Sequence, residues 1–165
     1  MIDMRKWEER SKETAYLLNP IFCGRILYST VQAYEKDCGR DLPFPLIYLV
    51  LPLILNSSVR ERISCRTQLM LWLQKNPDVL IDFADRARHS VAITNEAIEY
   101  FLQAGVIELT QAGDLRVNHS LKKLSPNKYT DQEVQDCITK GSHVGKWFAR
   151  IGNTETIYVM FGVKP

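Results

Sequence analysis

The chain has 165 residues, which corresponds to about one domain with a core large enough to fold without disulfides or a structural metal. Its 21 Lys and Arg against 19 Asp and Glu give a net charge of +2, far from the strongly basic balance of a dedicated nucleic-acid binder. The four cysteines have no paired spacing and no secretory segment begins the chain, so we expect a reduced, cytoplasmic protein.

The N-terminal part is predicted to consist of helices. Over residues 3–18, apolar and small side chains fall on one side of a helical wheel, which indicates an amphipathic surface helix. A second helix is expected over 21–37, because Asn19 and Pro20 break the first helix and suit the start of the next one. Gly39 is a typical residue for its end.

The most apolar stretch is the run of residues 42–55, which has no charge. It is shorter than the roughly 20 residues that a membrane span needs, so we expect a buried element and no contact with a membrane. Its three prolines disfavour a central strand. A core helix over 44–55 is therefore predicted, with Pro45 in the first turn and a kink imposed by Pro52 one turn after Tyr48.

Several short stretches follow one another in a characteristic order along nearly the whole chain. They are Asn19-Pro20-Ile21-Phe22-Cys23-Gly24, Tyr34, the run 42–55, Arg60-Glu61, Arg86, Glu96-Ala97, Gly105, Trp147-Phe148 and Gly162-Val163-Lys164-Pro165. None of them is a catalytic signature. As an ordered set, they resemble the small middle component of three-component ABC-ATPase (ABC-3C) systems, of which the Lamassu-type bacterial anti-phage systems are the best known.

After the core run, two short helices are predicted. Ser58 and Glu61 have the spacing of a capping box, which would open a helix over 59–63. A further helix is expected over 65–75, with Leu71 among its buried residues.

The next segment predicts a helix-turn-helix and a hairpin. Helical spacing over 79–87 is followed by a second helix over 95–104, with Thr94 as its N-cap. Strands over 106–109 and 115–117 would then pair as a wing. We therefore predict a mainly α, multi-helix fold that contains a winged-helix-like helix-turn-helix plus a β-hairpin wing.

The C-terminal part is again predicted to be helical. A second capping box at 130–133 opens a helix that extends to about Arg150. Gly141 and Gly145 lie on its apolar stripe, and they would let another helix approach closely. A last short helix is expected over 154–161.

These elements predict one compact domain in three parts. Residues 1–75 form a helical part around the core helix, residues 76–118 the winged-helix-like part, and residues 119–165 C-terminal helices that pack on the rest. The segment 120–127 has turn residues and is the expected mobile link.

Catalytic and cofactor-binding motifs are missing from the sequence. His89, His119 and His143 have no cysteine or carboxylate at metal-ligand spacing, so no metal, cofactor or catalytic residue is predicted. Cys23 and Cys137 lie on apolar stripes and are expected in the core. The chain is therefore interpreted as a subunit without enzymatic activity, and an enzyme that uses His143 or Cys23 is a third alternative.

The resemblance implies a role as a non-catalytic scaffold in an anti-phage complex. The small subunit would bridge an SMC-like ABC ATPase to an effector subunit, often a nuclease, and DNA would be reached through the complex. The alternative is a winged-helix transcriptional regulator that binds DNA directly. Two carboxylates in its second helix, Glu96 and Glu99, argue against that alternative.

Candidate contact residues follow from the family-like stretches and from the enrichment of aromatic and arginine side chains at interfaces. For partner subunits they are Trp7, Phe44, Tyr48, Arg60, Arg62, Trp147 and Phe161, and for nucleic acid they are Arg116, Lys122 and Lys123.

Overall fold

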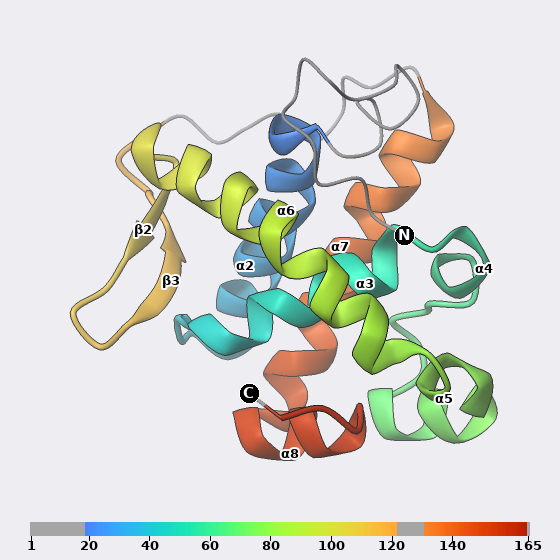
Figure 1. Cartoon of the computed structure of the whole chain (residues 1–165). Helices are drawn as coiled ribbons and strands as arrows, with labels where there is room; N and C mark the ends of the chain where they lie inside the picture. Colours follow the sequence, from blue (N-terminus) through green and yellow to red (C-terminus); the bar gives the residue numbers. More distant parts are fainter. Residues whose placement is uncertain (1–18, 122–130, 165) are drawn as a thin grey trace.

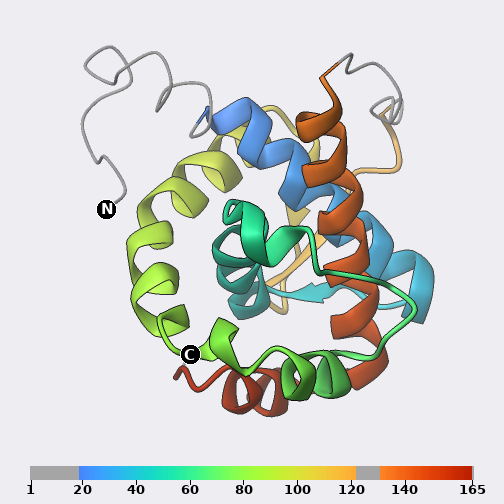
Figure 2. The ribbon, with the colours of Figure 1, turned by 90° about the vertical axis from the view of Figure 1, so that its right-hand side faces the viewer.

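The apolar run lies in the middle of the molecule, as predicted. In the computed structural model, which describes residues 19–121 and 131–164, it forms strand β1 (Leu42–Pro43), the 3-10 helix η2 (Phe44–Leu49) and helix α3 (Val50–Ile54). Figure 2 shows η2 and α3 enclosed by the longer helices. The members of this run that are at most 1% exposed are Leu42, Leu46, Ile47, Leu49, Val50, Leu51, Leu53 and Ile54.

The predicted single core helix over 44–55 is divided into two kinds of helix. Pro45 lies in the first turn of η2, where its missing N–H costs nothing. Pro52 lies inside α3 and has no N–H to donate to the carbonyl four residues earlier, at Tyr48. Regular α-helical bonding is therefore interrupted, and the first half of the run takes the tighter 3-10 form.

The elements are mainly helices, as the sequence predicted (Figure 1). Besides the central run, they are α2 (Pro20–Cys38), α4 (Ser57–Arg60), α5 (Leu69–Lys75), the 3-10 helix η3 (Pro77–Leu80), α6 (Phe83–Gln103), β2 (Ile107–Leu109), β3 (Asp114–Val117), α7 (Gln132–Ile151) and α8 (Thr154–Met160). The predicted helix over 3–18 and residues 122–127 of the predicted link 120–127 lie outside the described residues. The division into three parts stays a prediction.

Helix α2 begins and ends at the residues that the sequence indicated. The side chain of Asn19 accepts a hydrogen bond from the Ile21 N–H at 2.8 Å, and Pro20 occupies the first helical position. Gly39 ends the helix with φ +70°, a conformation that favours glycine, and its N–H donates to the Glu35 carbonyl at 2.7 Å.

The close approach predicted from Gly141 and Gly145 of α7 is confirmed, and α2 is the neighbouring helix. A Cβ at Gly141 would lie 3.0 Å from the Ile26 side chain, and one at Gly145 would overlap the Thr30 carbonyl oxygen. Only glycine lets the backbones of α2 and α7 come this close.

The start of α7 is capped by Asp131, whose side chain accepts hydrogen bonds from two N–H groups of the first turn.

The helix-turn-helix prediction is wrong. Residues 83–103 form the single helix α6, and Thr94, the expected N-cap, is 1% exposed inside it. No glycine or proline lies between the two predicted helices to stop the first one. In the same stretch, the Ser90 hydroxyl donates to the Arg86 carbonyl at 2.8 Å, which satisfies it within a continuous helix.

The predicted hairpin is confirmed and has a third strand. Strand β2 pairs antiparallel with β3, with Ile107 opposite Val117, and β1 pairs with the other edge of β3, with Leu42 opposite Leu115. The sheet order is β1-β3-β2. Pro43 lies on an edge strand, where a missing N–H is tolerated.

The short elements differ from their predicted limits. Helix α4 is capped by Asn56, whose side chain accepts the Val59 N–H at 3.3 Å, so the predicted start at Ser58 is wrong. Helix α5 is shorter than expected, and Leu71 is 45% exposed because it points away from the buried side. The predicted last helix is confirmed as α8, with Asn153 as its N-cap.

Side chains of α7 fix the segment between α4 and α5. Lys140 donates to the carbonyl of Ile63, and the Trp147 indole N–H donates to the carbonyl of Thr67 at 2.7 Å. Arg150 donates to a carbonyl between these two. Because these donors lie at roughly helical intervals on one side of α7, the segment is held along the length of the helix.

Candidate interaction surface

Burial shifts the pKa of two titratable side chains on α7, Cys137 and His143. Within residues 19–121 and 131–164, no group of three or more His, Cys, Asp or Glu is arranged to hold a metal ion. Burial raises the pKa of the Cys137 thiol to about 11, which keeps it protonated. The pKa of His143 is lowered mainly by burial and further by the positive charges of Lys140 and Lys146.

Among residues 19–121 and 131–164, none of the helices combines the length and the apolar character that a membrane span requires.

Two of the predicted contact residues lie in the core. Trp147 is 1% exposed and packs on Trp72 with ring centroids 4.9 Å apart. Phe161 is also 1% exposed and stacks on Phe83 at 4.6 Å. Neither aromatic side chain is exposed in the isolated chain, because each fills a gap between a short helix and a long one, and their contact with a partner stays a prediction.

Arg60 is also internal, with 5% of its surface exposed. Its guanidinium donates to the carbonyl of Ile54 at 2.9 Å, to Glu133 at 3.0 Å and to Asp136 at 3.1 Å. A buried arginine needs such partners. Arg60 therefore connects the end of the central run to the start of α7, and its role in this structure is architectural.

Arg62 remains partly exposed but has its own partners. It binds both carboxylate oxygens of Asp78, at 2.8 and 2.9 Å, and also donates to Asn76. The hydrogen bond from Arg62 lowers the pKa of Asp78. This pair holds the start of η3 next to α4.

Tyr48 and Phe44 are half-buried, with ring centroids 5.8 Å apart. The Tyr48 hydroxyl donates to Asn95 Oδ1 on α6 at 2.6 Å. Of the predicted contact residues that the structure describes, these two keep an accessible aromatic face. Trp7 lies outside the described residues.

Of the three predicted nucleic-acid residues, the structure describes Arg116 alone. Lys122 and Lys123 lie outside the described residues. Arg116 is exposed on β3 and donates to Glu108, its partner across the hairpin, at 2.9 Å. A paired arginine on a hairpin makes no basic patch by itself. Contact of these three residues with DNA stays a prediction.

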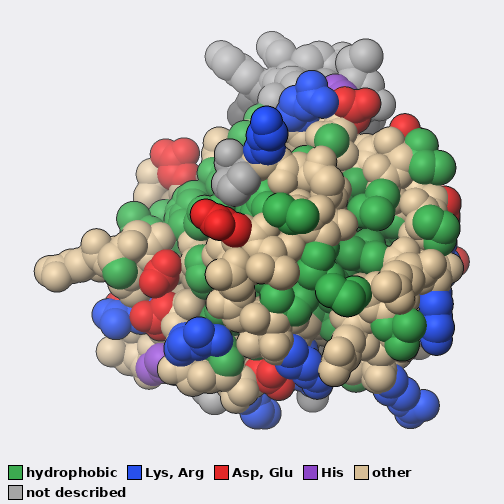
Figure 3. All heavy atoms as spheres, turned by 90° about the horizontal axis from the view of Figure 1, so that it is seen from below, with side chains coloured by type: hydrophobic (Ala, Val, Ile, Leu, Met, Phe, Trp, Pro, Cys, Tyr) green, Lys and Arg blue, Asp and Glu red, His purple; other side chains and the backbone are tan. Residues whose placement is uncertain are grey.

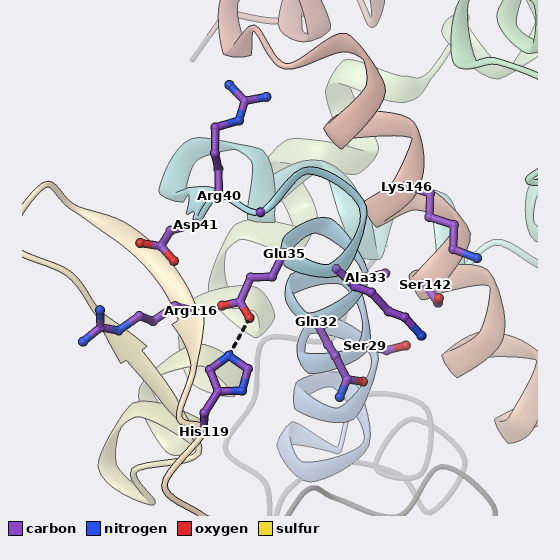
Figure 4. A pocket seen from close by; sticks show the side chains of 12 residues that line it. Ser29, Gln32, Ala33, Glu35, Arg40, Asp41, Arg116, His119, Ser142 and Lys146 are labelled. Atoms are coloured by element: carbon purple, nitrogen blue, oxygen red, sulfur yellow. Dashed lines mark hydrogen bonds and ion pairs between the residues drawn. The ribbon is translucent and has the colours of Figure 1, made fainter.

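A polar groove of about 760 Å³ lies between α2, the end of β3 and α7 (Figure 4). Glu35 points toward His119, 3.0 Å away, and its other carboxylate oxygen accepts the Val117 N–H at 2.8 Å. Lys146 on α7 and Arg116 on β3 point away from this pair, in different directions. The best-defined contacts in the groove therefore fasten the sheet to α2.

The opposite character is found on the face formed by α8, α5 and η3. Figure 3 shows hydrophobic side chains gathered there. The exposed fraction reaches 78% for Ile81 and 76% for Val159, so most of the surface of each aliphatic side chain is left in contact with water. We call this surface the α8 face; the exposed aliphatic side chains on or directly after its three elements are Met70, Leu71, Leu80, Ile81 and Val159.

Helix α8 separates two hollows beside this face. One, of about 190 Å³, lies between α8 and α5 and includes Met70 and Met160. The other, of about 500 Å³, lies between α6, α8 and the residues that follow α8. We call the larger one the α6–α8 groove. It is lined by Tyr48, Leu49, Ala84, Ala87, Arg88, Val91, Tyr158, Gly162, Val163 and Lys164.

Tyr48, which lines the α6–α8 groove, is predicted from the sequence as a contact residue, but none of the five residues of the α8 face is predicted as a contact. Ile81 and Val159 do not stand out by residue type, because aliphatic residues on short helices are most often core residues. A positional signal exists for one of them: Val159 follows the buried pair Ile157 and Tyr158, so it falls outside the buried stripe of α8.

Comparison with known families gives one match. The family model described as ABC-three component (ABC-3C) system Middle Component 3 matches residues 7–165. Comparison with curated proteins and with solved structures gives no match.

Proposed function

The chain belongs to the ABC-three component system Middle Component 3 family, and on this premise we propose that it is a non-catalytic subunit that bridges two partners. One partner is an SMC-like ABC ATPase and the other is an effector subunit, often a nuclease. The proposed setting is a cytoplasmic anti-phage complex of the Lamassu type. A middle component of a multi-component system implies partner components, which is the family-level support for this proposal.

The observation that carries the proposal is the apolar α8 face. Ile81 and Val159 are mostly exposed in the isolated chain, and exposed apolar patches mark surfaces that a partner covers. The polar groove is formed by other elements, mainly α2 and α7. Two surfaces of different character suit a subunit that contacts two different partners.

We also propose that part of the chain is a winged-helix module that serves in protein docking. The supporting observation is that α2, β1, α3, α6, β2 and β3 keep this relative order, with η2 before α3 and with α4, α5 and η3 inserted between α3 and α6, and that the sheet order is β1-β3-β2. In that arrangement α6 takes the place of the helix that reads DNA in other proteins. Its exposed Glu99 would face phosphates, and its Asn95 is already bonded to Tyr48. These contacts disfavour the alternative of a DNA-binding regulator.

The proposal is tested by co-expressing the chain with the ATPase and effector subunits encoded next to it. Effector should co-purify with a tagged ATPase only when the chain is present, and the variants Ile81→Asp and Val159→Asp should abolish one of the two contacts. Leu109→Asp is the matched control, because Leu109 is 53% exposed on the hairpin, away from the α8 face. Retention of both contacts by both variants would refute the role of the α8 face, and a chain that captures neither subunit would refute the proposed function.

A further inference from the structure

The α6–α8 groove has one wall made by a single side of α6. Ala84, Ala87, Arg88 and Val91 are spaced as i, i+3, i+4 and i+7, so they form one stripe along the helix. With a rise of 1.5 Å per residue, the stripe is about 10 Å long, or two turns. Because the side chains of the two alanines are small, they leave space along this wall for the large side chains of another element.

The groove is preformed. The Tyr48 hydroxyl is held by Asn95, and the Tyr158 hydroxyl donates to the carbonyl of Pro45. On the far wall, the N–H of Val163 donates to the carbonyl of Tyr158 at 3.1 Å, which fixes the segment after α8. An occupant therefore meets walls that need little ordering, which favours binding. The groove has a volume of about 500 Å³, which lies in the range of clefts that bind ligands.

The charges at the groove have one sign. Its lining contains Arg88 on the α6 wall and Lys164 on the opposite wall, and it contains no Asp or Glu. Arg88 also contacts Asp85 at 2.8 Å, but both side chains are more than 65% exposed, and a surface pair of this kind is weak and can be exchanged. An apolar floor with a cation on each side complements an apolar segment that carries carboxylates at its edges.

We propose that an amphipathic helix of a partner subunit docks in the α6–α8 groove, with its apolar side against Tyr48, Ala87 and Val91 and its Asp or Glu side chains next to Arg88 and Lys164. This is the helix-in-groove mode of recognition, in which a few apolar anchors at helical spacing supply affinity. The inference rests on the proposed function, because it assigns to one groove the contact with one of the two partners.

The experiment uses the full chain in the co-expressed complex. Ala87→Glu places a charged side chain in the groove and should weaken capture of one partner subunit by at least about tenfold. Val91→Glu, at a position that is 39% exposed, is the second variant and should have the same effect if the first one fails to fold. Circular dichroism of each variant checks the fold.

Lys164→Glu tests the charge complementarity. It should weaken capture of the same subunit by about threefold and flatten the salt dependence of binding, because an ion pair at the rim is screened by salt. Lys36→Glu is the matched control: it makes the same charge change on α2, in the polar groove that would face the other partner, and should leave capture of this subunit unchanged.

The outcomes separate this inference from the proposed function. If the unmodified chain assembles with its partners and folded Ala87→Glu and Val91→Glu bind equally well, the groove is not a docking site, although the subunit role stands. If the unmodified chain assembles with no partner, the proposed function itself fails and the groove inference fails with it.

Discussion

The packing of α7 on α2 through Gly145 makes a sharp stability prediction. A Cβ added at this position would overlap the Thr30 carbonyl oxygen and lie 3.1 Å from the Ala33 Cβ, and the backbone of α2 cannot move aside as a flexible side chain would. Overpacking of this kind costs about 1–3 kcal/mol. Replacing glycine by alanine inside a helix returns about 0.5–1 kcal/mol. We therefore expect Gly145→Ala to destabilise the protein by ~1–2 kcal/mol.

Thermal and urea unfolding measure this effect. For a domain of this size the melting temperature should fall by ~2–8 °C, since each kcal/mol shifts it by about 2–4 °C. Gly141→Ala should cost less, because the nearest contacts of the added Cβ, the γ2 methyl and the carbonyl oxygen of Ile26, lie at 3.0 Å and do not overlap it as the Thr30 carbonyl oxygen does at Gly145. Thr139→Ala, at an exposed position of the same helix, is the control and should be neutral or slightly stabilising. A Gly145→Ala variant as stable as the unmodified protein would show that the two helices are not in close contact.

Three further predictions concern charged groups and thiols. Arg60→Ala should destabilise the protein by ~1.5–3 kcal/mol in urea unfolding, because it removes hydrogen bonds between charged groups and leaves a carbonyl unpaired, and an unchanged midpoint would contradict this. Arg62 lowers the pKa of Asp78 from its ordinary value of 3.8. The ion pair therefore stabilises the fold above pH 3.8, and this contribution is lost as the pH falls through the lower pKa of the folded state. Asp78→Asn should flatten the dependence of the unfolding free energy on pH in that acid range. Cys137, with a pKa of about 11, should resist a thiol reagent at pH 8 in the folded protein and react on unfolding. Fast reaction of Cys137 in the native protein would contradict its burial. Cys65, which is only half-buried, serves as the reference for a more accessible thiol.

Features set by local chemistry could be predicted from the sequence. The start of α2 at Asn19, its end at Gly39 and the hairpin around β2 and β3 all depend on residues within a few positions of each other. The close contact of α7 was also predictable, because Gly141 and Gly145 lie one turn apart on an apolar stripe and leave space there for a neighbouring backbone.

Features set by tertiary packing could not be predicted in this way. Thr94 is a good N-cap residue by type, but burial inside α6 decides its role. The pairing of Leu42 with Leu115 joins distant parts of the chain, for which no local pattern exists. The same limit applies to the interaction surface: Trp147 was predicted at an interface and is 1% exposed, whereas Val159 was not and is 76% exposed.

We propose that this chain bridges an ABC ATPase to an effector subunit. Native mass spectrometry of the chain, expressed with both neighbouring subunits and then with each one alone, tests it most directly. We expect one assembly that contains all three subunits, and two partial assemblies that each contain the chain. A chain that keeps the mass of a free monomer or homodimer in all three preparations would contradict the claim.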